Sequence, residues 1–102
     1  MKMWIDDVRP KPEGYDYWCK SVNEAKCKIT SIEKVRIFGS LTLIDIDHDA
    51  GDYANDGGDY AKLLDWFEET GRNYPIRIHS MNPVGVEKMR RIIQRNVWTE
   101  VR

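Results

Sequence analysis

The sequence predicts an α/β fold, a small three-layer sandwich in which about four mainly parallel strands carry helices on both faces. Apolar segments of strand length alternate along the chain with amphipathic segments of helical period. This alternation requires crossover connections, which make neighbouring strands parallel and place helices against the sheet. The chain has 102 residues, 41% of them hydrophobic, which suffices for one core. We therefore expect residues 1–102 to form a single domain.

Four segments, residues 3–5, 15–20, 41–47 and 75–79, have the composition of strands. The third is the clearest, because its sequence, LTLIDID, is almost continuously apolar, as in a strand covered on both faces. Between the first two strands lies a turn with two prolines, residues 9–14, which excludes a helix interior there. The last few residues form too short a segment to assign.

Three amphipathic segments are predicted helices. The first begins with a capping box from Ser21 to Glu24. Asp59 is the expected N-cap of the second helix and Gly71 its end, and Asn82 is the expected N-cap of the third, followed by a proline at the first helical position. The apolar stripes behind these caps are Val22, Ala25, Ile29 and Ile32; Tyr60, Leu63, Leu64 and Phe67; and Val86, Met89, Ile92, Ile93 and Val97.

Right-handed crossovers leave few topologies for these elements. The simplest places the first strand in the centre of the sheet, the second strand on one side, and the third and fourth on the other, as in a flavodoxin-like sheet. In such sheets ligands bind beyond the carboxyl ends of the strands, where the strand order reverses. We therefore expect the functional site beside the ends of the first and third strands.

Polar, reactive side chains follow three of the predicted strands, and both histidines of the chain are among them. The carboxyl ends of parallel strands meet at one edge, so residues far apart in sequence converge there. Folding alone does not explain an apolar strand that ends in Asp-His-Asp, because grouped carboxylates repel one another and lose hydration. The candidate residues are Asp6, Asp7 and Arg9 after the first strand, Asp47, His48 and Asp49 after the third, and His79, Ser80 and Asn82 after the fourth.

The acidic residues suggest a divalent cation. The stretch from residue 45 to 59 contains six aspartates and no Lys or Arg. Magnesium prefers carboxylate oxygens, so we expect Mg²⁺ on Asp6, Asp7 and Asp47. Asp45 lies inside the predicted strand, and we interpret it as a polar strand residue, not as a ligand.

The overall charge argues against some partners. A net charge of -1 and a pI near 6.1 do not favour duplex DNA binding, which depends on a broad basic surface. The basic segment 88–102 is interpreted as a solvated helix face. No apolar stretch approaches the roughly 20 residues that span a bilayer, and Cys19 and Cys27 form no disulfide framework. We expect a cytoplasmic protein without a membrane partner; the sequence leaves the oligomeric state open.

Three motifs, DDxR near the start, DHD at residues 47–49 and HSxNPVG at residues 79–85, occur in this order. Together they resemble the cyclic-phosphate processing receiver-like family, which is related to response-regulator receiver domains, from Met1 to about Ile93. The resemblance implies a receiver-like fold. It also matches Asp6 and Asp7 to the acidic pair that binds Mg²⁺ in receivers, Asp47 to their phosphoacceptor, and His79 with Ser80 to their small hydroxyl residue.

This chain departs from signalling receivers in two predicted features: no helix between the first two strands, and no fifth strand ending in the lysine that contacts the phosphoryl group. Our hypothesis is therefore a phosphoesterase that processes a cyclic phosphate on a nucleotide or an RNA end. His48 and His79 would be the acid–base pair, since imidazole titrates near neutrality. Asp49 would bind the metal or orient a histidine ring, and Arg9, Ser80 and Asn82 would contact the substrate.

Two other functions stay open. The first is a non-catalytic receiver-like module that senses phosphate or accepts a phosphoryl group on Asp47. The second is a protein-interaction module, in which tryptophan side chains contact a partner. The four tryptophans are Trp4, Trp18, Trp66 and Trp98.

Overall fold

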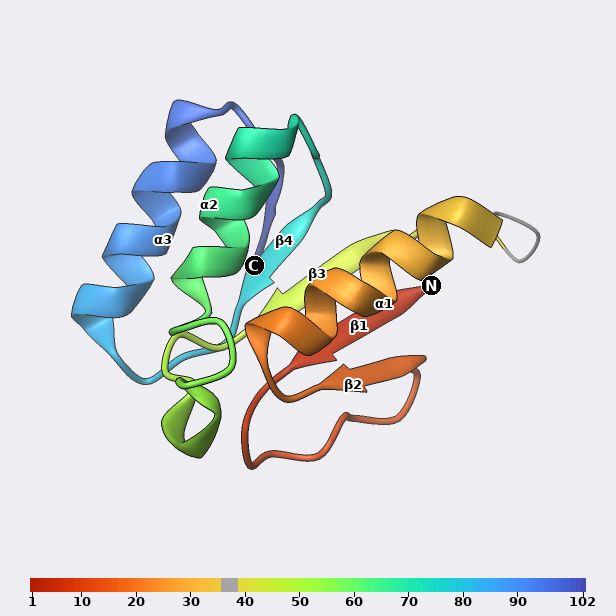
Figure 1. Cartoon of the computed structure of the whole chain (residues 1–102). Helices are drawn as coiled ribbons and strands as arrows, with labels where there is room; N and C mark the ends of the chain where they lie inside the picture. The colour runs from red at the N-terminus through yellow and green to blue at the C-terminus, as the bar shows by residue number, and fades with distance from the viewer. Residues whose placement is uncertain (36–38) are drawn as a thin grey trace.

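The computed structural model describes residues 1–35 and 39–102, and within these ranges five parallel strands form one sheet in the order β2-β1-β3-β4-β5 (Figure 1). No helix in the described ranges is long and apolar enough to cross a lipid bilayer. The strands are β1 (Lys2–Ile5), β2 (Tyr17–Cys19), β3 (Leu43–Ile46), β4 (Ile76–Ile78) and β5 (Glu100–Val101). The helices are α1 (Val22–Val35), α2 (Ala61–Thr70) and α3 (Pro83–Arg95), with a 3-10 turn, η1 (Gly51–Tyr53), before α2.

The predicted α/β class and strand order are confirmed. β1 lies between β2 and β3, and β4 follows β3, with every pair parallel. β1 begins one residue before the predicted strand, and the next three strands are shorter than predicted. As expected, no helix joins β1 to β2, and residues 6–16 make this crossover as a loop.

A fifth strand corrects the sequence analysis, which left the last residues unassigned. β5 pairs in parallel with β4, with Glu100 beside Ile76 and Val101 beside Arg77. Its two residues are too few for any periodicity to show in the sequence. Neither residue is a lysine, so this strand does not supply the lysine that receivers use.

The layers also differ from the predicted three-layer sandwich, because the three helices pack on one face of the sheet (Figure 1). From β2 onward each crossover steps in the same direction across the sheet, and right-handed crossovers in one direction place their helices on one face. One strand face and all three helices form the core. Its strand residues are Met3, Ile5, Cys19, Ile44, Ile46 and Ile76.

We call the other side of the sheet, which carries the side chains of Trp4, Asp45 and Arg77, the open face. Part of the loop 6–16 covers it: the ring of Tyr15 packs edge-on against the indole of Trp4, with 5.4 Å between the ring centroids. Trp4 is 6% exposed and Asp45 is fully buried. On the open face, polar groups are therefore buried under a loop, although the sequence predicted that a helix would cover this face.

The helix ends test the predicted caps. The side chain of Asn82 accepts a hydrogen bond from the backbone N–H of Gly85, and Gly71 ends α2 with a left-handed φ of 69°, both as predicted. Asp59 is not the N-cap of α2, because its carboxylate accepts from the backbone N–H of Ala50 and Tyr60 takes the N-cap position. Val97 does not extend the stripe of α3 either: it follows the helix, with φ 57°, and is 87% exposed.

Candidate functional site

Asp6, Asp47 and His79 form a row across the carboxyl ends of β1, β3 and β4. The backbone N–H of Asp47 donates to Ile5 O, and that of His79 donates to Ile46 O, so the parallel register continues past the strand ends. Side chains two residues apart on a strand share a face, so this row lies on the open face, one step beyond Trp4, Asp45 and Arg77 along their strands. Strand pairing alone thus brings two carboxylates and an imidazole together.

His79 occupies the centre of the site. Its Nδ1 lies 2.6 Å from Asp45 Oδ1 and its Nε2 lies 3.0 Å from Asp6 Oδ2. The ring stacks on the indole of Trp4 with 3.7 Å between centroids and 3° between planes, and its side chain is 8% exposed. Both nitrogens and one ring face are therefore fixed by the protein.

Asp45 has a larger role than the one assigned from sequence. Its carboxylate accepts hydrogen bonds from the Tyr15 hydroxyl and from Arg77, at 3.0 Å for the Arg77 guanidinium. Burial raises the pKa of Asp45, but its hydrogen-bond donors, His79 first, together hold that pKa below its ordinary value. Asp45 is therefore an ionised, buried acceptor that sets the orientation of the His79 ring.

Asp6 is fully buried at the start of the loop. Its Oδ1 accepts from the backbone N–H groups of Val8 (2.9 Å) and Arg9 (2.8 Å), and its backbone carbonyl accepts from the Trp18 indole. Burial raises the pKa of Asp6, but the backbone N–H groups and the His79 ring outweigh it and lower the pKa. The proline-containing turn thus holds Asp6 as a carboxylate.

Asp7 points to a different neighbour. A Cβ atom added to Gly51, which has φ 55°, would lie 2.2 Å from Asp7 Oδ2, so only glycine leaves room for this carboxylate. Burial, followed by the charges of Asp6 and Asp47, raises the pKa of Asp7. Asp7 is therefore a carboxyl group close enough to Asp6 and Asp47 to be affected by their charges.

His48 lies beside the start of α3. Its Nδ1 is 2.9 Å from Asp49 Oδ1, and Asn82 Nδ2 lies 3.3 Å from the other oxygen of Asp49. A Cβ atom on Gly85 would lie 2.3 Å from Cγ of the His48 ring, so α3 approaches the ring closely. Within residues 1–35 and 39–102, no hydrogen bond is recorded for Nε2 of His48.

The other predicted residues lie along the same edge. The backbone of Arg9 is held by the Trp4 indole, which donates to Arg9 O at 2.8 Å, while no hydrogen bond or ion pair of its guanidinium is recorded in the described ranges. Ser80 Oγ accepts from the backbone N–H of Asn82 at 3.2 Å, so both residues also build the turn into α3.

Several residues of the site were not predicted as functional. Asp45 and Arg77 each precede a predicted site residue by two positions in a strand, and this period-two spacing is the signal that could have found them. Tyr15 and Trp18 carry no such signal, because their contacts depend on the path of the loop. A glycine in the first turn of a helix, Gly85, is itself a sign of close approach.

The row includes a group with the composition of a metal site. One ligand atom from each of Asp6, Asp47 and His79 lies within 4.8 Å of the others. Asp6 and Asp47 supply the oxygen ligands that Mg²⁺ prefers, but the third member of the group is a nitrogen. Asp7, expected as the third Mg²⁺ ligand, lies outside this group as the structure describes it.

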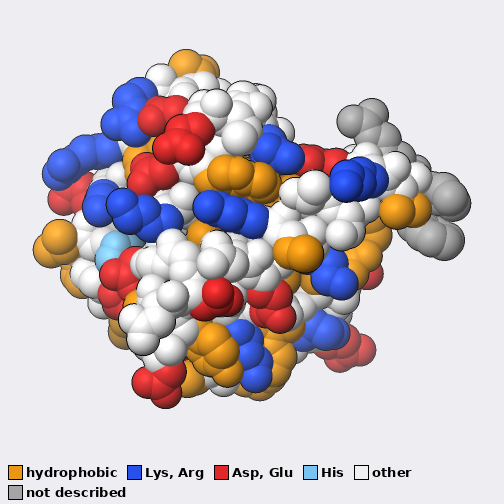
Figure 2. All heavy atoms as spheres, viewed as in Figure 1, with side chains coloured by type: hydrophobic (Ala, Val, Ile, Leu, Met, Phe, Trp, Pro, Cys, Tyr) orange, Lys and Arg blue, Asp and Glu red, His pale blue; other side chains and the backbone are white. Residues whose placement is uncertain are grey.

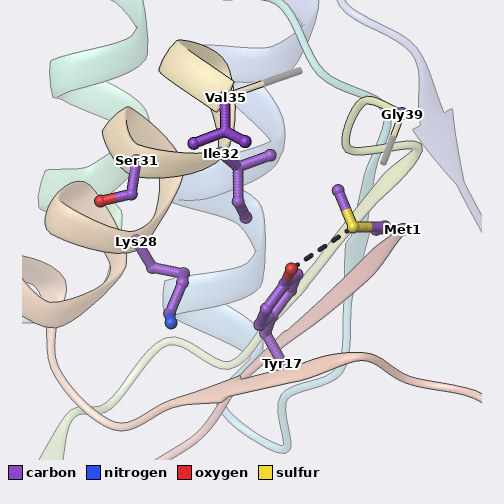
Figure 3. Close-up of a pocket in the computed structure, with 7 residues that line it drawn as sticks. All are labelled: Met1, Tyr17, Lys28, Ser31, Ile32, Val35 and Gly39. Atoms are coloured by element: carbon purple, nitrogen blue, oxygen red, sulfur yellow. Dashed lines mark hydrogen bonds between the residues drawn. The ribbon is translucent and has the colours of Figure 1, made fainter. Parts of the chain in front are cut away.

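A hollow elsewhere on the surface is a weaker candidate for the functional site than the row at the carboxyl ends of the strands. A hollow of about 190 Å³ lies between α1 and the amino-terminal end of the sheet (Figure 3). Its lining is mostly apolar, and it lies at the end of the sheet opposite to that where ligands of α/β folds bind. The lining residues are Met1, Tyr17, Lys28, Ser31, Ile32, Val35 and Gly39.

A protein-family model described as the cyclic-phosphate processing receiver domain matches residues 1–95. This match covers all the residues of the site and confirms the resemblance inferred from the three motifs. No curated protein and no solved structure gives a significant match.

Proposed function

We propose that this chain, which belongs to the family of cyclic-phosphate processing receiver domains, is a phosphoesterase that opens a cyclic phosphate on a nucleotide or an RNA end. The observation that carries the proposal is the pairing of His48 with Asp49. Asp49 accepts from Nδ1, which leaves Nε2 of an otherwise packed ring without a recorded protein partner in the described ranges. A ring fixed in this way is suited to proton transfer at Nε2.

The reaction is a hydrolysis. The oxygen of a water molecule forms a bond to phosphorus, one of the two ester P–O bonds of the ring breaks, and a phosphomonoester with a free hydroxyl remains. The attacking water loses a proton to a base, and the leaving oxygen gains one from an acid. We assign proton transfer to His48, and Asp49 orients its ring.

The second acid–base assignment, His79, stays a prediction. Its two nitrogens lie within hydrogen-bond distance of Asp45 and Asp6, so it reaches a substrate only beside the Asp6 carboxylate. Its loss would still disturb the row.

Positive charge is the other requirement, because negative charge spreads over the phosphate oxygens as the ring opens. The guanidinium of Arg9 is suited to bidentate hydrogen bonding with the phosphate, since the backbone of Arg9 is fixed beside the carboxyl end of β1. A divalent cation held by Asp6 and Asp47 would offset the carboxylates and polarise the phosphate. Ser80 and Asn82 stay predicted substrate contacts.

The charge distribution favours a small or single-stranded substrate. Lys and Arg side chains are interspersed with Asp and Glu over the face that carries the helices (Figure 2). Such a mixture does not form the continuous basic surface on which duplex binding depends.

The experiment is phosphorus NMR of 2′,3′- and 3′,5′-cyclic nucleotides and of an RNA oligomer with a cyclic phosphate end, each incubated with the protein. We expect the ring phosphorus signal of at least one substrate to be replaced by that of a phosphomonoester. His48→Gln should reduce this rate by 10²-fold or more, while Gln94→Ala, on the exposed side of α3, should keep it. No conversion by folded wild-type protein would contradict the proposal.

A further inference from the structure

We propose that Asp6, Asp47 and His79 bind a divalent transition-metal ion, such as Mn²⁺, Co²⁺ or Zn²⁺, in preference to Mg²⁺. The proposal differs from the expected magnesium site in its third ligand, which is an imidazole nitrogen in place of Asp7. It goes beyond the proposed function and replaces the acid–base role predicted for His79, because a ring that binds an ion through Nε2 and Asp45 through Nδ1 has no nitrogen left for proton transfer. It is tested without a substrate.

The first step of the argument is the spacing of the ligand atoms. Asp6 Oδ2 and His79 Nε2 are 3.0 Å apart. Two ligands at right angles, each about 2.1 Å from one ion, are about 3.0 Å apart. Asp47 lies on the central strand between them, and its ligand oxygen completes a group within 4.8 Å. Three neighbouring strands thus supply one side of a coordination shell.

The second step is the orientation of the imidazole. Asp45 receives hydrogen bonds from Tyr15 and Arg77, so it acts only as an acceptor toward Nδ1 of His79. With the ring proton on Nδ1, Nε2 carries a lone pair on the side of Asp6 and is available to an ion that lies next to both atoms. A carboxylate that holds the far nitrogen of a ligating histidine is the usual second sphere of a transition-metal site.

The third step is charge. With that tautomer, a nitrogen lone pair and a carboxylate oxygen lie 3.0 Å apart inside the protein, and two acceptors this close need a positive species that binds both. Asp47 is the second carboxylate of the group. A divalent ion neutralises the two ligand carboxylates.

The fourth step is the choice of ion. Imidazole is a ligand of Zn, Cu, Fe and Ni sites, and the affinity of a site with nitrogen and oxygen ligands rises from Mn²⁺ through Co²⁺ to Cu²⁺. Mg²⁺ instead takes oxygen ligands and keeps several waters. Asp7, which would complete an all-oxygen set, lies outside the group. The donor set therefore favours the transition ions.

The test is calorimetric titration of the chelator-treated, full-length chain with Co²⁺, Mn²⁺ and Mg²⁺. We expect one Co²⁺ or Mn²⁺ per chain, bound at least tenfold more tightly than Mg²⁺. The Co²⁺-loaded protein should show, in its proton NMR spectrum, one strongly shifted exchangeable signal from the Nδ1–H that Asp45 holds.

Three variants separate the ligands. His79→Gln should abolish the shifted proton and weaken Co²⁺ binding by 10²-fold or more, and Asp45→Asn should weaken it by 10–100-fold. His48→Gln removes the other histidine of the edge and should keep the shifted proton. Circular dichroism of each variant shows whether it is folded.

Three results would overturn the proposal: equal affinities for Mg²⁺ and Co²⁺, Co²⁺ binding that His79→Gln leaves unchanged, or no binding by the folded wild-type chain. The last result would mean that a proton, and not a metal, lies between His79 and Asp6. Because no substrate is present, each result is independent of whether the protein turns over cyclic phosphates.

Discussion

At the scale of single residues, glycines decide how closely neighbouring elements approach the site. Gly51 makes room for the carboxylate of Asp7, and Gly85 makes room for the ring of His48. The sequence predicted the polar residues of this edge, because strand ends and side-chain chemistry are visible in it. It did not predict these contacts, since they depend on how a loop and a helix pack against the edge.

Gly85→Ala tests this packing. Alanine favours a helix by about 1 kcal/mol over glycine, so a loss of activity would not come from helix propensity. The added methyl group would lie 2.3 Å from the His48 ring and must displace it. We expect turnover of a cyclic phosphate to fall by about 10²-fold, as for a catalytic group moved by 1 Å. Unchanged turnover, with Gln94→Ala as the reference, would remove His48 from the proposed chemistry.

At the scale of elements, the edge strand β5 depends on a side-chain contact. Arg90 of α3 forms a two-pronged ion pair with Glu100, with N–O distances from 2.7 to 2.9 Å. The hydrogen bonds from Arg90 lower the pKa of Glu100, although burial opposes them. This pair explains why a two-residue strand, invisible to periodicity, adds to the sheet.

Glu100→Gln should lower the free energy of unfolding by about 1 kcal/mol at pH 7, because a partly buried, two-pronged pair is lost. The folded pKa of Glu100 lies below its ordinary value, so the stabilisation exists above the unfolded pKa and is lost as the pH falls through the folded pKa. Urea denaturation at pH 7 and at pH 3 measures the difference. Glu87→Gln, in an exposed pair with Arg91, is the control and should change little. An equal effect of Glu100→Gln at both pH values would refute this explanation.

At the scale of the whole molecule, the crossovers from β2 to β5 all step in the same direction across the sheet, and this places all three helices on one face. The strand order followed from the sequence because crossovers are right-handed and short. The position of the helices on one face did not follow from the sequence, because the apolar run in β3 is typical of a strand covered by helices on both faces. In this protein the loop 6–16, and not a helix, covers Asp45 and Trp4. The site is the result, a row of two carboxyl groups and an imidazole on the open face, in which Asp6 is fully buried.

A ligand that joins three strands should stabilise the whole domain. With Co²⁺ at 100 times its dissociation constant, mass action adds about 2.7 kcal/mol to the free energy of unfolding. For a chain of this size we expect the Tm to rise by roughly 10–20 °C in a thermal scan. The same scan of His79→Gln should show a small rise or none. A Tm that Co²⁺ does not raise would contradict the proposed ligands.

The most direct test of the central claim, hydrolysis of a cyclic phosphate at this edge, is turnover in water enriched in ¹⁸O, followed by phosphorus NMR. Attack by water on phosphorus predicts one ¹⁸O in the phosphomonoester formed by wild-type protein, and loss of this product in His48→Gln. The account would be contradicted if no product formed while beryllofluoride bound at Asp47, because the chain would then be a phosphate-sensing receiver and not a hydrolase.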